Sequence, residues 1–133
     1  MYNCLFYGSL RQGEYNHSYF NKGDFYFLQT VELQGYKLYS LGSYPGVKES
    51  DNNTDTIICD VVVIEDKPTF ESIDRMELGA GYSRKLVDVK LDTGELIKCV
   101  IYIYEDRVKE EWLVEGGDWS KFLKQEKENI CVD

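Results

Sequence analysis

The feature that most constrains the fold is a nearly unbroken apolar run at residues 57–64, which reads IICDVVVI. A strand with one face in water alternates apolar and polar residues, whereas this run is apolar and mostly β-branched. It therefore predicts a strand over residues 56–64 that is buried on both faces. The rest of the chain must supply apolar elements that cover it.

Other segments also have the short, apolar or alternating patterns that are typical of strands. They are residues 2–7, 25–33, 36–41, 84–91 and 96–104. The last two are separated by Asp92-Thr93-Gly94, a turn sequence, so they are expected to form a hairpin.

Helices are fewer than strands. Asp66 is a suitable N-cap for a helix that carries Pro68 in its first turn and should end at Leu78-Gly79. Asp118 is a suitable N-cap for a last helix, and residues 14–21 allow a further short one. After Lys127 we expect a disordered tail.

Because strands dominate and tight turns join several of them, the chain is expected to be α+β. The expected form is a curved, mostly antiparallel sheet or small β-barrel with a few flanking helices. The 133 residues suit one domain spanning 1–133.

Composition excludes several classes of function. A net charge of −9 would repel a phosphate backbone, so nucleic acid is not an expected partner. The four cysteines form no C-x-x-C pair and His17 is the only histidine, so no zinc site is expected. The first residues lack the basic and long apolar regions of a signal peptide, so none is expected, and no run approaches about 20 apolar residues. We therefore expect a cytoplasmic monomer without a membrane segment, metal or cofactor.

Common catalytic motifs are also missing. The sequence has no G-x-S-x-G, no G-x-x-x-x-G-K-[ST] and no G-x-G-x-x-G. A cysteine nucleophile would need a histidine base, and only His17 is available. Any catalysis should therefore use carboxylates, tyrosines and backbone dipoles.

Two places could carry such chemistry. Tyr7, Gly8, Ser9 and Leu10 follow the first strand, where a glycine lets the backbone turn and its N–H groups bind an anion; the alternative is a plain turn.

The second place is Glu77, at the end of the predicted helix and shortly before Tyr82 and Arg84. There Glu77 could face a cleft that raises its pKa by burial, or it could be a solvated surface glutamate. Arg84 is expected to pair with a nearby carboxylate as a structural residue.

These motifs together resemble the γ-glutamylcyclotransferase-like family. The likeness rests on the opening Tyr-Gly-Ser-Leu, a pattern close to L-D-x-x-E followed by Y-x-R, and two further segments. In this chain they are residues 7–10, 73–77 with 82–84, 38–46 and 117–119.

The resemblance implies that Glu77 is the catalytic acid/base, that residues 7–10 bind the glutamyl group and that Tyr82 lines the site. The implied substrate is a small γ-glutamyl amide, whose α-amino group attacks its own γ-carbonyl to release 5-oxoproline and a free amine. Such a reaction needs no protein nucleophile and no metal. Two alternatives stay open: a non-catalytic module that binds a small ligand, and an interaction protein that acts through its acidic surface.

Overall fold

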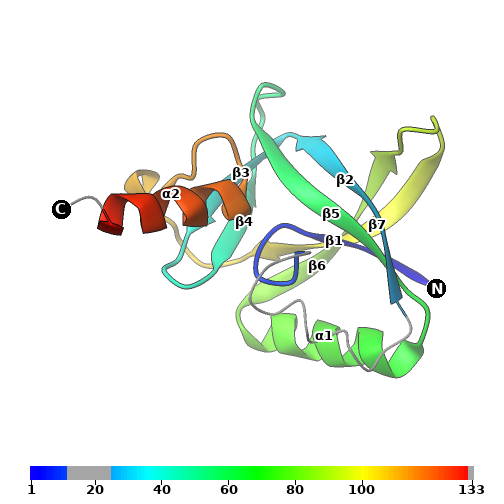
Figure 1. Cartoon of the computed structure of the whole chain (residues 1–133). Coiled ribbons are helices and arrows are strands. Elements are labelled where there is room, and N and C mark those ends of the chain that lie inside the picture. The colour runs from blue at the N-terminus through cyan, green and yellow to red at the C-terminus, as the bar shows by residue number, and fades with distance from the viewer. Residues whose placement is uncertain (12–24, 132–133) are drawn as a thin grey trace.

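The computed structural model describes residues 1–11 and 25–131. The helix suggested for residues 14–21, and His17, lie outside them. The described chain forms a five-stranded sheet, a separate two-stranded hairpin and two α-helices (Figure 1). The strands are β1 (Tyr2–Phe6), β2 (Phe25–Gln34), β3 (Tyr36–Ser40), β4 (Pro45–Glu49), β5 (Thr56–Ile64), β6 (Tyr82–Lys90) and β7 (Leu96–Tyr104). The helices are α1 (Lys67–Gly79) and α2 (Trp119–Cys131), with a short 3-10 turn, η2 (Glu110–Trp112), before α2.

The sheet confirms the predicted α+β class and the mostly antiparallel pairing. Its strand order is β2-β5-β1-β7-β6, and only the β1–β7 pair is parallel. The predicted hairpin is present as β6 and β7. A bulge between Phe27 and Gln29 shifts the register of β2 against β5, which increases the local bend of the strand.

The small β-barrel considered as an alternative is wrong, because the sheet is open and ends at β2 and β6. In the described chain, β3 and β4 pair with each other and with no strand of the five-stranded sheet, and a single bridge joins Tyr39 of β3 to Leu113. They pack across the sheet instead, where Leu38 and Val47 join the core formed by β5 and β7.

Each face of the sheet is covered by a different layer. On one face Val61 and Ile101 pack with the β3–β4 hairpin and with Trp119 of α2. On the other face Val62 and Val100 pack against α1. Strand β5 is buried along nearly all its length, so the double burial predicted from its apolar run is confirmed.

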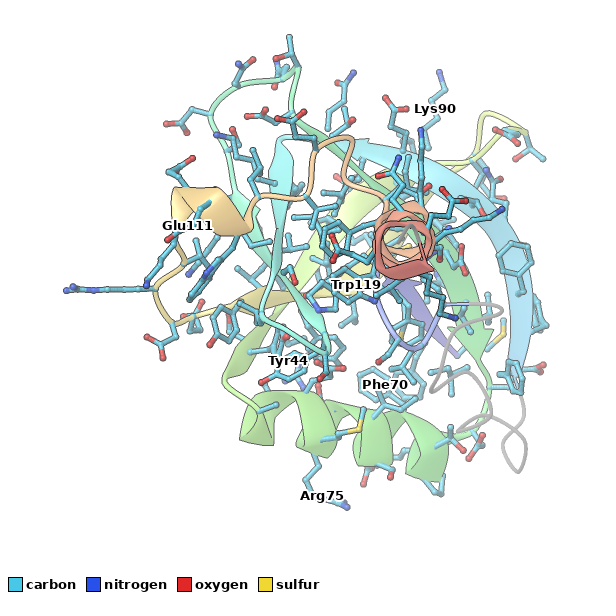
Figure 2. The ribbon with its side chains drawn as sticks, turned by 60° about the vertical axis from the view of Figure 1, so that its left-hand side comes forward. Tyr44, Phe70, Arg75, Lys90, Glu111 and Trp119 are labelled. Atoms are coloured by element: carbon cyan, nitrogen blue, oxygen red, sulfur yellow. The ribbon has the colours of Figure 1, made fainter. Side chains whose placement is uncertain are left out.

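Helix α1 begins and ends where the sequence predicts. The Asp66 carboxylate accepts a hydrogen bond from the Thr69 backbone N–H at 2.9 Å, and Pro68 lies in the first turn. Phe70 and Ile73 are buried against the sheet; Figure 2 shows Phe70 on the sheet side of the helix and Arg75 pointing away. After the C-cap, Gly81 adopts a φ of 95°, the left-handed conformation that commonly ends helices.

Helix α2 is capped by Asp118, as predicted, through a 3.1 Å bond from the Lys121 N–H. It continues past Lys127 to Cys131, and the disorder expected for the tail stays a prediction. Once its first turns are anchored by the buried Trp119, each further residue adds a backbone hydrogen bond at little cost. Neither of the α-helices in the described residues is long and apolar enough to cross a membrane.

Candidate functional site

A cavity of about 280 Å³ lies at the end of β1, between α1 and the turn that joins β3 to β4. Its volume is close to the lower limit of ordinary ligand pockets, so it suits a small molecule. All residues that the sequence predicts for the site line this one cavity: Tyr7, Gly8, Ser9, Leu10, Glu77 and Tyr82. Two segments about 70 residues apart in the chain are thus brought together.

Gly8 and Arg11 close the turn after β1, because the Arg11 N–H donates to the Gly8 carbonyl at 3.0 Å. A side chain at Gly8 would collide with Pro45, since an added Cβ would lie 2.7 Å from Pro45 Cγ. The φ of Gly8 is not positive, so glycine is needed here for close packing against Pro45. The sequence suggests a different reason for this glycine, namely that it allows the backbone to turn sharply.

The two predicted tyrosines use their hydroxyls to hold the cavity wall. Tyr7 is buried, and its hydroxyl donates to the Tyr102 carbonyl at 2.6 Å. The Tyr82 hydroxyl donates to the Pro45 carbonyl at the same distance. Burial, followed by the nearby Glu77, raises the pKa of Tyr82 well above its ordinary range. Both hydroxyls therefore stay protonated, and they connect the end of β1 to β7 and β6 to β4.

Glu77 lies in the last turn of α1, half-buried at the cavity wall. Burial raises its pKa from an ordinary 4.5 to about 7, in the direction that the sequence predicts. The last turn of α1 contains no basic residue, and the negative end of a helix dipole also disfavours a carboxylate. Glu77 is thus poised to exchange a proton near neutrality.

Asp74, one turn earlier on α1, has a different role. Its carboxylate accepts a 2.9 Å hydrogen bond from the Tyr102 hydroxyl and forms an ion pair with Arg84. Arg84 therefore has the structural carboxylate partner expected from the sequence. These contacts fix α1 against β6 and β7, and so set the position of Glu77.

Sequence reasoning missed part of the cavity wall, notably Tyr44, Pro45, Met76 and Tyr102. Tyr44 and Pro45 belong to a segment noted only for its family likeness, and they reach the site because Pro45 packs against Gly8, just after β1. Figure 2 shows Tyr44 just above α1, on its sheet-facing side. Tyr102 comes from the middle of β7, where no local pattern marks it.

Comparison with known proteins fits this arrangement. Residues 4–121 match the model of the γ-glutamyl cyclotransferase, AIG2-like family. The chain belongs to this family. The γ-glutamylcyclotransferase family protein YtfP of Escherichia coli is 30% identical over 114 residues, which cover 85% of this chain and 91% of YtfP. A Vibrio cholerae relative is 31% identical over 121 residues, 85% of this chain and 90% of its own.

Solved structures show the same fold. An uncharacterized protein from Pyrococcus horikoshii has a TM-score of 0.73 at 25% identity, with 96% of this chain and 98% of that one covered. An AIG2-like protein from Mus musculus has a TM-score of 0.71 at 18% identity, over 90% of this chain and 88% of the mouse chain. Family membership therefore agrees with the α+β architecture and suggests cyclotransferase chemistry.

Proposed function

We propose that this protein is a cyclotransferase that releases 5-oxoproline and a free amine from a small γ-glutamyl amide. The observation that carries the proposal is Glu77, a half-buried carboxylate with a pKa raised to about 7, in one cavity with the Tyr7–Leu10 turn. Family membership supports the same reaction class.

In the proposed reaction, ionised Glu77 takes a proton from the substrate's α-ammonium group. The freed amine attacks the γ-carbonyl carbon and forms the new ring C–N bond, and negative charge develops on the carbonyl oxygen. Collapse of this intermediate breaks the original amide bond as protonated Glu77 gives its proton to the leaving nitrogen. The ring nitrogen then loses its second proton, which passes through Glu77 to the released amine, so that the amine leaves as an ammonium ion. The atoms balance without water or a protein nucleophile.

Two properties of the site suit these steps. A base works best when its pKa is near the working pH. A pKa of about 7 is also closer to the pKa of an ammonium group than that of an ordinary glutamate is. The reaction is also intramolecular, so holding the substrate bent can supply much of the rate enhancement. A cavity of about 280 Å³ with buried aromatic walls would restrict a small substrate in this way.

The test is a panel of γ-glutamyl compounds, including a lysine isopeptide, glutathione and simple alkyl amides, assayed for 5-oxoproline. We expect turnover of at least one compound and a loss of about 10²–10⁴-fold in Glu77→Gln, the usual contribution of a positioned acid/base. Glu71→Gln is the matched control, because Glu71 is exposed on the same helix, where it pairs with Lys67 at 3.7 Å. It should retain wild-type rates.

Failure would take either of two forms. If Glu77→Gln releases 5-oxoproline at the wild-type rate, Glu77 has no part in the reaction. If calorimetry instead detects saturable binding of a γ-glutamyl compound that wild-type protein never cleaves, the alternative of a non-catalytic binding module is correct.

A further inference from the structure

Arg11, the residue directly after the Tyr7–Leu10 turn, belongs to a buried charge network. Its side chain is only 11% exposed and that of Asp60 only 3%. Arg11 Nε lies 3.3 Å from Asp60 Oδ1, and Arg11 Nη1 lies 3.0 Å from Asp118 Oδ1. Thr30 also donates to Asp60, at 3.1 Å.

This network connects three separate parts of the fold. Asp60 lies in the middle of β5, and Asp118 is the N-cap of α2. The Arg11 backbone N–H closes the turn onto the Gly8 carbonyl. A single arginine thus joins the cavity turn to β5, the neighbour of β1 in the sheet, and to α2.

Stability alone is a weak explanation for such a network. Removing an arginine and a carboxylate from water costs about as much as their attraction returns, and apolar replacements are often as stable. What a buried arginine provides is geometry, because its planar fork can bind two carboxylates in fixed directions. Lysine, with one ammonium on a flexible stem, cannot reproduce this arrangement.

We propose that Arg11 is a positioning residue, whose two carboxylate contacts hold the Gly8–Leu10 backbone in the conformation that lines the substrate cavity. Arg11 itself does not line the cavity, so it acts through the turn. The link to catalysis rests on the proposed cyclotransferase function. The claim that Arg11 holds the turn in its conformation does not depend on that function.

The test uses Asp118→Asn and Arg11→Lys. Asparagine is as good an N-cap as aspartate, so Asp118→Asn removes a charged partner of Arg11 while α2 can still form. The control is Val89→Ala, which removes buried volume from β6 outside the cavity. The first readout is hydrogen exchange of the residue 8–11 amides by NMR without ligand. The second is kcat and KM for the γ-glutamyl compound that wild-type protein cleaves fastest.

In both Asp118→Asn and Arg11→Lys we expect the residue 8–11 amides to exchange about 10-fold faster or more, because a charge-assisted hydrogen bond is lost. We also expect KM to rise by a larger factor than kcat falls. Val89→Ala should lower the unfolding midpoint without either change. Unaltered exchange in both variants, or equal acceleration in Val89→Ala, overturns the proposal. If wild-type protein cleaves no γ-glutamyl compound, the proposed function fails, and the exchange data still decide whether Arg11 positions the turn.

Discussion

Replacing Glu77 with glutamine should make the protein more stable at alkaline pH and leave its stability nearly unchanged in mild acid. The side chain is half-buried in a largely apolar wall, and its pKa rises from 4.5 to about 7 on folding because of burial. Folding therefore favours the neutral form of Glu77. Glutamine has nearly the same shape and never carries the charge.

The sign and size follow from proton linkage. Between pH 4.5 and about 7 the folded protein binds this proton and the unfolded chain releases it, so stability falls as pH rises through that window. One pKa unit corresponds to about 1.4 kcal/mol, so the rise from 4.5 to about 7 gives an upper limit of about 3.5 kcal/mol. Because the carboxylate is only half-buried and partly reaches water, we expect about 1–3 kcal/mol.

Urea unfolding at about pH 5 and about pH 8.5 measures this difference. Glu77→Gln should exceed wild type by about 1–3 kcal/mol at the higher pH and by a few tenths at the lower. The control Glu71→Gln removes an exposed, ion-paired carboxylate from the same helix, and should change stability by less than about 0.5 kcal/mol at either pH. An equal advantage of Glu77→Gln at both pH values would refute the reasoning.

Three further outcomes are expected. The kcat/KM of wild-type protein for 5-oxoproline release should rise through a pH of about 7 as Glu77 ionises. A kcat/KM that stays constant between about pH 6 and about pH 8 would contradict a base role for Glu77. Gly8→Ala should lower stability by about 1–3 kcal/mol in urea unfolding, because its Cβ would lie 2.7 Å from Pro45 Cγ, and Pro45→Ala should relieve part of that loss. Tyr82→Phe should lower the free energy of unfolding by about 1–2 kcal/mol, because the Pro45 carbonyl loses its 2.6 Å donor. Its kcat should stay within about 10-fold of wild type, and a much larger loss of kcat would give the hydroxyl a direct role in the reaction.

Local patterns in the sequence predict most of the fold. The apolar run of β5, the Asp66 cap of α1 and the Asp118 cap of α2 each act over a few residues, and the structure contains all three. Strand β4 was not predicted, because Pro45 and Gly46 are unusual in strands. It forms because Gly46 lets the strand approach Tyr104 closely; an added Cβ there would lie 2.9 Å from Tyr104 Cβ.

The sequence motifs mark residues that the structure brings to one cavity, and they miss the lining residues that only the fold brings in. The Tyr7–Leu10 turn and Glu77 are marked by their motifs, and both line the cavity. Tyr44 enters through the turn between β3 and β4. Whether the sheet closes depends on long-range pairing, and no pattern within one strand can determine that.

The difference between Asp74 and Glu77 explains why only one of two neighbouring carboxylates on α1 suits proton transfer. Both lie on the side of the helix that faces the sheet. Asp74 accepts from the Tyr102 hydroxyl and pairs with Arg84, so both of its carboxylate oxygens are occupied. Glu77 forms no ion pair with another residue of the described part of the chain, and burial disfavours its charge. Environments that separate two similar groups in this way are how enzymes assign acid/base roles. Asp74 therefore orients the helix, and Glu77 is the carboxylate that we propose as the acid/base.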